Sequence, residues 1–291
     1  ANDGINARNS SKGTDLTINA ATTTGADDGI YADNNGSGAL SITTTGTTTG
    51  GDSGIFAQNN DTGTGDLTIN AATTTGGYDG IRARNLGKGA LSITTTGTTR
   101  GTSGYGIFAP SKGTSLTINA ATTKGAAIGI FAKNYGTDLT INAATTTGGR
   151  HGIYAKNEST GALSITTTGK TTGGTGHGIY AYNAGSGGTS ITVASTGSIE
   201  TSADKGYGIF NKSSGTAAKL NEITVAGSIT TAGEGAHGIY NLGDFNKTIL
   251  AAGGSILTTK SNTAGIFQAG DNNTAYISGE VNSGLHLRNS V

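Results

Sequence analysis

The sequence lacks cysteine and contains a single proline, and both features narrow what the chain can be. Without cysteine there are no disulfide bonds, no thiolate catalysis and no cysteine-based zinc sites. With 52 glycines but only one proline, the chain is neither a collagen nor a Pro/Gly-rich linker. No stretch approaches the ~18 consecutive apolar residues of a membrane-spanning helix.

Charged residues are also scarce: they make up 12% of the chain, and 18 basic residues balance 18 acidic ones. A disordered chain would normally combine a hydrophobic content as low as this one, 33%, with a high net charge. A neutral chain has no overall basic field for phosphates, so we do not expect nucleic acid as a partner. The remaining residues are mostly Thr, Ser, Asn and Gly, a mixture that suits β-structure with many tight turns.

A Gly-Ile pair recurs along the entire chain at spacings of 23 to 30 residues. Within each repeat the periodicity is two, because Leu40 and Ile42 alternate with Ser41 and Thr43, as in a half-buried strand. So short a unit cannot bury its own apolar side, but stacked units can, with main-chain hydrogen bonds between copies spaced ~4.8 Å apart. The isoleucines of the pairs are Ile5, Ile30, Ile55, Ile81, Ile107, Ile130, Ile153, Ile179, Ile209, Ile239 and Ile266.

The repeat predicts an all-β fold, a parallel β-solenoid of about 11 rungs, where a rung is one full coil of the chain. We interpret residues 1–291 as a single domain, with near-identical rungs over 1–188 and more divergent rungs over 189–291. The two kinds of near-identical rung, Leu-Thr-Ile-Asn-Ala-Ala and Leu-Ser-Ile-Thr-Thr-Thr, mostly alternate, which indicates duplication of a unit of about 50 residues.

An asparagine four residues after most Gly-Ile isoleucines predicts a ladder of amide side chains inside a turn. Such a ladder would satisfy turn main-chain groups that are otherwise buried without partners. Ser111, Ser213 and Gly243 replace the asparagine in later rungs, so we expect the ladder to weaken toward the C-terminus. Its predicted members are Asn9, Asn34, Asn59, Asn85, Asn134, Asn157 and Asn183.

An aromatic residue directly follows most of the Gly-Ile pairs. If the isoleucine points inward, the alternation of a strand turns the ring outward. A row of exposed rings is a candidate binding surface for a protein or a glycan. Two alternatives stay open: the rings shield one another by stacking between rungs, or the strand is inverted and the rings lie inside. The candidates are Tyr31, Phe56, Phe108, Phe131, Tyr154, Tyr180, Phe210, Tyr240 and Phe267, with Asn6 and Arg82 in place of two rings.

Three histidines share one position, two residues before a Gly-Ile isoleucine: His151, His177 and His237. Because His151 and His177 belong to adjacent rungs, they are weak candidates for a metal site or an acid-responsive site. In other rungs the same position holds Asp, Tyr or Ile, and this variety predicts an exposed turn. We therefore expect no metal and no cofactor.

One short segment, Gly51-Asp52-Ser53-Gly54, matches a serine-protease signature. That chemistry requires a histidine and an aspartate beside the serine, but the first histidine of the chain is His151, many rungs away. Carbohydrate-cleaving β-helices gather paired carboxylates and basic residues on one face, whereas acidic residues here are scattered over turns. We expect no catalytic residues and no enzymatic activity.

Segments such as residues 223–239, Ile-Thr-Val-Ala-Gly-Ser-Ile-Thr-Thr-Ala-Gly-Glu-Gly-Ala-His-Gly-Ile, resemble the strand repeats of bacterial autotransporter (type V secretion) passengers. The resemblance is one of repeat style and covers nearly the whole chain. It implies a right-handed β-helix that is secreted or displayed on the cell surface, exported through a C-terminal outer-membrane barrel that would be its only link to the membrane. Because the chain begins at Ala1, we expect it to be part of a longer protein.

The repeats and the resemblance together lead us to expect an adhesin that binds a host-cell surface protein or glycan, or another copy of itself. Flat strand faces would make many weak contacts at once, and the Thr/Asn-rich face could form lateral hydrogen bonds between rods. A released passenger acting as a soluble ligand for a host receptor is the alternative, and a carbohydrate-active enzyme is the third. The irregular alternation of Thr17/Asn19 with Ser41/Thr43 argues against ice binding.

Overall fold

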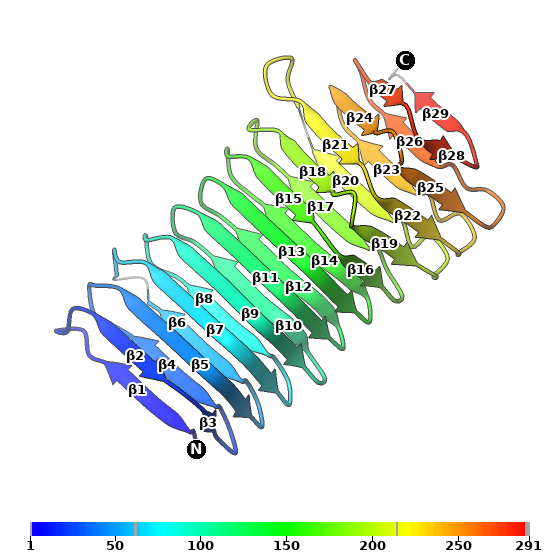
Figure 1. Cartoon of the computed structure of the whole chain (residues 1–291). Helices are drawn as coiled ribbons and strands as arrows, with labels where there is room; N and C mark the ends of the chain where they lie inside the picture. The colour runs from blue at the N-terminus through cyan, green and yellow to red at the C-terminus, as the bar shows by residue number, and fades with distance from the viewer. Residues whose placement is uncertain (1, 61–62, 214, 289–291) are drawn as a thin grey trace.

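The computed structural model describes residues 2–60, 63–213 and 215–288, and throughout these ranges the chain is strand, turn or loop. The strands stack in parallel to form a solenoid of about 11 turns, which Figure 1 shows as one continuous stack from the N- to the C-terminus. The predicted all-β solenoid is confirmed. Within the described ranges no helix has the length and apolar character needed to cross a membrane.

The first sheet contains the strands that begin at the Gly-Ile pairs. It has twelve strands, one more than there are Gly-Ile pairs, because the last strand sets Leu285 in register with Ile266. The strands are β1 (Ile5–Asn9), β4 (Ile30–Asn34), β6 (Ile55–Asn59), β8 (Ile81–Asn85), β10 (Tyr105–Ser111), β12 (Ile128–Asn134), β14 (His151–Asn157), β17 (Ile179–Asn183), β20 (Ile209–Ser213), β23 (Ile239–Leu242), β26 (Ile266–Ala269) and β29 (Leu285–Arg288).

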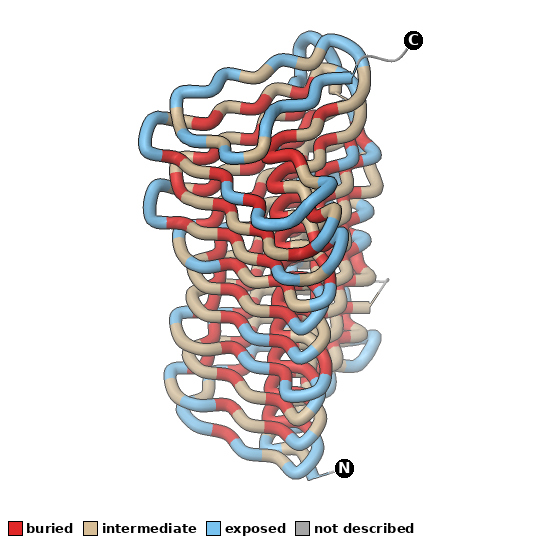
Figure 2. The backbone as a smooth tube through the Cα atoms, turned by 90° about the vertical axis from the view of Figure 1, so that its right-hand side faces the viewer, coloured by how far each residue is buried: buried red, intermediate tan, exposed pale blue. Residues whose placement is uncertain are grey.

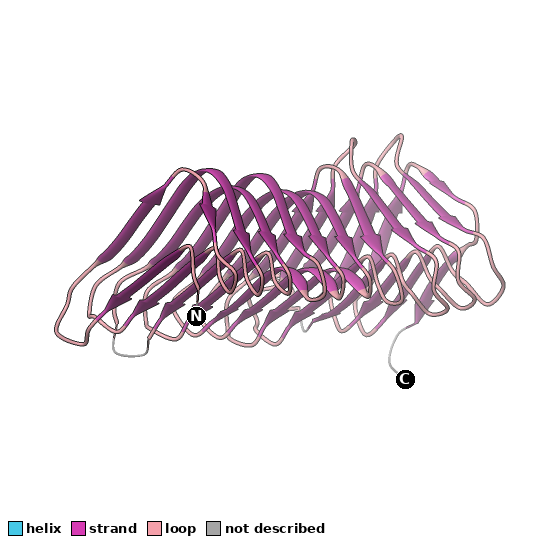
Figure 3. Cartoon of the chain, turned by 90° about the horizontal axis from the view of Figure 1, so that it is seen from below, coloured by secondary structure: helices cyan, strands magenta, loops and turns pink. Residues whose placement is uncertain are grey.

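The second sheet contains the Leu-x-Ile strands and the threonine runs. Figure 3 shows the layers of strands joined by loops. Five rungs carry one long strand each: β5 (Leu40–Gly50), β7 (Leu67–Gly76), β9 (Leu91–Gly101), β11 (Leu116–Gly125) and β13 (Leu139–Gly148). In the other rungs two shorter strands take its place: β2 (Leu16–Ala20) and β3 (Thr23–Thr24), β15 (Leu163–Thr167) and β16 (Lys170–Gly173), β18 (Thr189–Val193) and β19 (Ser198–Thr201), β21 (Asn221–Val225) and β22 (Ser228–Thr231), β24 (Asn246–Leu250) and β25 (Ser255–Thr258), β27 (Thr274–Ile277) and β28 (Glu280–Val281).

The two alternating rung types differ in the length of their strands in the second sheet. The Leu-Ser-Ile strands β5 and β9 have 11 residues, whereas β7 and β11 have 10. The pairing register accordingly shifts by one residue between Thr44 and Thr47, where β5 meets β7. Each duplicated unit therefore places an extra residue in every second rung, and the excess is absorbed as a bulge.

The core is a set of columns, each made of equivalent residues stacked from rung to rung. Figure 2 shows buried positions repeating along the axis of the molecule. Ile130 and Ala132 of β12 and Leu139 and Ile141 of β13 are all fully buried. The predicted inward orientation of the Gly-Ile isoleucines and of the Leu-x-Ile residues is confirmed, and it follows from the alternation of side chains along a strand.

A column of threonines also points inward, which the sequence reasoning missed. Thr48, Thr74 and Thr146 are fully buried, although they lie within runs of identical residues. The neighbouring rungs explain the glycine of the Gly-Ile pair: a Cβ on Gly129 would lie 2.5 Å from Thr146 Cγ2 and 2.6 Å from Gly152 O. From β19 to β25 the column is isoleucine, beginning with Ile199, which pairs with Thr171, and it ends at Val281 of β28.

The predicted asparagine ladder is present. Asn34 Nδ2 donates to Asn59 Oδ1 at 2.9 Å and to Gly38 O in its own turn at 3.0 Å. Asn157 is bonded in the same way to Asn183 Oδ1 at 3.2 Å and to Gly161 O at 3.1 Å. The ladder is interrupted in the middle of the rod: Asn85 Oδ1 has no hydrogen-bond partner among the described residues, and at the predicted serine, Ser111, the hydroxyl accepts the main-chain N–H of Gly113.

In the last rungs one column of the core becomes polar. The column that holds alanine in earlier rungs continues as Asn211, Asn241 and Gln268, all fully buried. Asn211 Nδ2 donates to Asn241 Oδ1 at 2.8 Å, and Gln268 Oε1 accepts the hydroxyl of Thr248. The change in side-chain chemistry falls inside the segment that the sequence analysis separated as 189–291.

Candidate functional site

The aromatic column lies on the outer side of the first sheet. In β12 the fully buried Ile130 and Ala132 flank Phe131, which is only partly buried. The same alternation places Tyr154 outside Ile153 in β14. The inverted arrangement, with rings inside and isoleucines outside, is therefore wrong.

The rings stack on one another along the rod. Phe131 and Tyr154 have centroids 5.1 Å apart with planes 1° from parallel, and Tyr154 and Tyr180 are 4.6 Å apart at 5°. Tyr31 and Phe56 repeat the arrangement at 5.0 Å and 3°. Each ring thus covers the face of its neighbour, and what the column turns to solvent is ring edges and tyrosine hydroxyls. The prediction that the rings stack between rungs is confirmed, and a binding role for these residues stays a prediction.

Arginines interrupt and end the stack. Arg82, which replaces a ring in β8, lies 5.9 Å from the Phe56 centroid and 5.7 Å from the Phe108 centroid. Arg8 lies over Tyr31 at 5.0 Å, and Arg288 lies over Phe267 at 5.6 Å at the other end. A guanidinium over a ring face is a favourable cation–π contact, so Arg82 joins the two parts of the column electrostatically.

The position two residues before each isoleucine is not an exposed turn, contrary to our expectation. His151 is 4% exposed and Asp79 is 1% exposed. These side chains are buried because each one accepts a main-chain N–H from the next rung. His151 Nδ1 accepts from His177 at 2.9 Å, and Asp79 Oδ1 accepts from Tyr105 at 2.8 Å. In the rungs that form this hydrogen bond the position holds only Asp or His, because both side chains offer an acceptor.

The same bond recurs along the rod. Asp28 accepts the N–H of Ser53 at 2.9 Å, and His177 Nδ1 accepts that of Tyr207 at 3.1 Å. His237 Nδ1 accepts the N–H of Ala264 at 2.8 Å. The sequence shows Asp at this position in early rungs and His in later ones, but only the parallel register shows that the donor is a main-chain N–H in the following rung.

Burial shifts the pKa values of these groups in opposite directions for acid and base. It lowers the pKa of His151 to about 4 and that of His177 to about 4, with Arg150 adding to both effects by repulsion. It raises the pKa of Asp28 and of Asp79 above the ordinary value. At neutral pH the histidines are therefore uncharged, and each has a free Nδ1 lone pair for its hydrogen bond.

The histidine pair is poorly suited to a metal. The rings of His151 and His177 are 5.2 Å apart, but both Nδ1 lone pairs are already used by main-chain donors. Within the described part of the chain no group of three His, Cys, Asp or Glu side chains gathers around a common point. Both rings instead extend the aromatic column sideways, since His177 stacks on Tyr207 at 5.0 Å and 5°.

The segment Gly51-Asp52-Ser53-Gly54 forms the turn before β6. Ser53 is fully buried, and its main-chain oxygen accepts the N–H of Gly29. This arrangement fits the interpretation that the segment matches the protease signature only because Gly, Asp and Ser are common in turns.

In the first eight rungs, the outward side chains of the Leu-x-Ile part of the second sheet are uncharged hydroxyl and amide groups, whereas charged residues such as Arg100 and Lys124 lie further along the same strands. We call this surface the hydroxyl face. We define it by two outward residues from each Leu-x-Ile strand, and a hydrogen bond between amide side chains joins adjacent rungs where Asn142 Nδ2 donates to Asn119 Oδ1 at 2.8 Å. Its members are Thr17, Asn19, Ser41, Thr43, Thr68, Asn70, Ser92, Thr94, Thr117, Asn119, Thr140, Asn142, Ser164, Thr166, Ser190 and Thr192.

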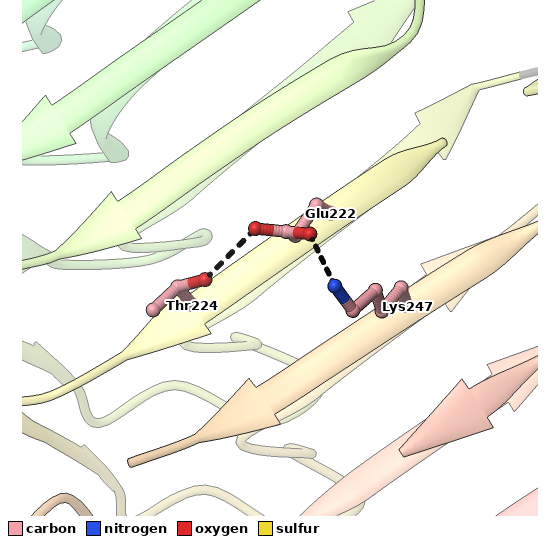
Figure 4. A network of polar contacts seen from close by, with 3 residues as sticks. All are labelled: Glu222, Thr224 and Lys247. Atoms are coloured by element: carbon pink, nitrogen blue, oxygen red, sulfur yellow. Dashed lines mark hydrogen bonds and ion pairs between the residues drawn. The ribbon is translucent and has the colours of Figure 1, made fainter. Parts of the chain in front are cut away.

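Charges enter these two columns only after the hydroxyl face ends. Lys247 Nζ of β24 lies 2.9 Å from Glu222 Oε2 of β21, and Glu222 Oε1 accepts the hydroxyl of Thr224 at 3.4 Å (Figure 4). These residues continue the columns of Ser190 and Thr192.

Comparison with known proteins identifies no relative of this chain. No protein-family model matches the chain, and neither a curated protein nor a solved structure gives a significant match.

Proposed function

We propose that this chain is a secreted or surface-displayed adhesive rod that associates laterally with other copies of itself, without enzymatic activity. The observation that carries the proposal is the hydroxyl face, which repeats the same hydrogen-bonding groups over eight consecutive rungs with no charged side chain. Autotransporter origin, a right-handed coil and location at the bacterial surface belong to the same proposal and rest on the repeat style of the sequence.

The physical argument is one of repetition. A Thr, Ser or Asn side chain both donates and accepts hydrogen bonds, so two such faces can pair without a unique partner for each group. A single exposed hydrogen bond contributes only about 1 kcal/mol. Eight rungs hold their groups in one rigid array, so after the first contact forms the others are effectively intramolecular. The result is association that depends on many residues and on no single one.

The test is to place charge on this face without changing its shape. The triple variant Asn70→Asp, Asn119→Asp and Asn142→Asp replaces three outward amides by nearly isosteric carboxylates. We expect it to remain folded but to lose self-association, because facing carboxylates repel one another and cannot donate. Sedimentation of the purified rod and settling of cells that display it would both report the loss.

A matched control adds the same charge elsewhere, through Ser11→Asp, Thr160→Asp and Ser186→Asp in exposed turns. This variant should associate like the unmodified chain. If both triple variants associate equally well, the hydroxyl face is not the contact surface. If the unmodified chain stays monomeric yet binds host cells saturably, the soluble-ligand alternative replaces self-association. A barrel domain encoded after this segment would test the autotransporter origin separately.

A further inference from the structure

The outer side of the first sheet is basic, although the whole chain is neutral. Only two columns of side chains face outward there, the aromatic column and the column two residues further along each strand. Among the described residues of these two columns there is a single carboxylate, Asp33. The cationic members are Arg8, Arg82, Arg84, Lys133, Lys156, Lys212 and Arg288.

Five of these cations form a straight segment that we call the basic face: Arg82, Arg84, Lys133, Lys156 and Lys212. They extend from β8 to β20, five rung steps, or about 24 Å at the ordinary strand spacing. Among the described carboxylates, the one ion-paired to this segment is Glu158, which lies just beyond β14. Glu158 Oε1 is 2.6 Å from Lys156 Nζ and 3.4 Å from Lys133 Nζ.

The rings beside these cations restrict what can bind. The faces of Phe131, Tyr154 and Tyr180 are covered by one another, so neither sugar rings nor nucleic-acid bases can stack on them. Base stacking on aromatic faces is the usual basis of single-strand binding. The exposed ring edges carry the positive part of the quadrupole, and the tyrosine hydroxyls can donate. Edges, hydroxyls and cations thus all favour an anion, and none requires a flat base.

We propose that the basic face binds a linear acidic polysaccharide, laid along the rod axis so that its carboxylate or sulphate groups meet the cations of β8, β12, β14 and β20. Charge complementarity is the main attraction, and the row of ring edges forms the floor beneath the sugar chain. Glu158 competes with the ligand for Lys133 and Lys156, so it limits the affinity of the free protein.

The experiment measures binding of a fluorescent, size-fractionated heparin fragment to the whole chain at physiological salt. In the triple variant Lys133→Gln, Lys156→Gln and Lys212→Gln we expect the affinity to fall about tenfold or more. The slope of log affinity against log salt should also fall, by roughly two to three. Glu158→Gln should act oppositely and raise the affinity about threefold, because it removes the competing carboxylate.

The matched control removes three lysines from the second sheet, through Lys124→Gln, Lys170→Gln and Lys247→Gln. It has the same net charge as the test variant, and it too breaks ion pairs, those of Lys170 with Glu200 and Lys247 with Glu222. Its affinity for heparin should stay within about twofold of the original, since these lysines lie on the other sheet. Circular dichroism would show that all variants remain folded, as expected for outward positions.

Other ligands separate the remaining explanations. Hyaluronate, which carries carboxylates only, tests whether sulphate is needed, and binding of either polymer supports the proposal. Dextran has no charge and should not bind. The proposal is overturned if heparin and hyaluronate both fail to bind, if the control variant loses as much affinity as the test variant, or if a single-stranded oligothymidylate of equal charge binds more tightly than heparin.

Discussion

At the scale of single residues, stability depends on which face of a strand a residue occupies. Ile130 is fully buried, whereas Thr140 lies on the hydroxyl face. Ile130→Asp should therefore place an unpaired charge in the core and cost more than about 4 kcal/mol, enough to unfold several rungs together. Thr140→Asp should change the unfolding free energy by less than about 1 kcal/mol. Denaturant unfolding followed by circular dichroism compares the two, and equal effects would contradict the assignment of faces.

Substitutions of asparagine should also differ in their effect on stability according to whether the side chain is buried or outward. Asn157 Nδ2 donates to Gly161 O in its own turn and to Asn183 Oδ1 in the next rung, so Asn157→Ala leaves buried polar groups without partners. We expect a loss of about 3 kcal/mol in unfolding free energy. The outward Asn142→Ala removes one exposed bond and should cost less than about 1 kcal/mol. If Asn157→Ala lowers the unfolding free energy no more than Asn142→Ala does, the hydrogen bonds of the internal amide ladder contribute little to stability.

At the scale of the strand, the Asp and His side chains that precede some of the Gly-Ile pairs make stability depend on pH. His151 and His177 titrate near pH 6.5 when unfolded but have a pKa of about 4 in the fold. Between these values the unfolded chain binds more protons, so unfolding becomes easier as pH falls from 6.5 toward 4. The contribution at risk is up to about 3 kcal/mol for each histidine. Denaturation midpoints at pH 7.5 and 4.5 would measure it.

The control for this prediction is the double variant His151→Asn and His177→Asn. Asparagine keeps an oxygen acceptor for the next rung but does not titrate in this range, so the fall in stability between pH 7.5 and 4.5 should shrink to the part contributed by His237, whose pKa is also lowered by burial. An unchanged fall would place the acid sensitivity elsewhere. Asp28 and Asp79 have the opposite sign: burial raises their pKa values, so protonation at low pH favours the folded state in the N-terminal rungs.

The strands themselves could be predicted from the sequence, because alternation and a fixed repeat leave little freedom. Ile130 inside and Phe131 outside follow from the period of two once Gly-Ile is placed on the buried side. The buried threonines could not be predicted in this way, because Thr146 lies in a run of three identical residues with no contrast to set its phase. The role of His151 was also missed, because its partner is a main-chain N–H, which every residue type in the next rung except proline provides.

The polar end of the core was equally hidden from sequence reasoning. Nothing in the sequence pattern marks Asn211 and Asn241 as buried, and only the register aligns them with the buried Ala181. The candidate binding surfaces could be predicted only in part: the aromatic column was evident and stacking was one of its open alternatives, but choosing that alternative and finding the basic column beside it required the pairing of strands.

At the scale of the whole molecule, the rungs should be interchangeable units. Residues 116–138 make up one coil, in which Leu116 pairs with Leu91 on one side and with Leu139 on the other. Deleting 116–138 brings Leu139 onto Leu91 and β14 onto β10, so every register is kept. We expect a folded rod about 4.8 Å shorter, which small-angle scattering and thermal unfolding would detect.

Deleting only residues 116–127 is the control for this experiment. It removes the second-sheet strand β11 but leaves β12 of the first sheet, so the two sheets lose their common register. This shorter deletion should be far more destabilising than the longer one. If the full-rung deletion unfolds the chain just as readily, the rungs are not independent units.

The parallel stacking of rungs has a mechanical consequence. The main-chain hydrogen bonds between rungs point along the rod axis, so tension applied to the two ends pulls on one inter-rung layer after another. Under load the molecule would shed coils singly, each freeing about 25 residues and lengthening the tether by roughly 80 Å. A cell attached through the adhesive rod proposed above would yield under flow in small steps.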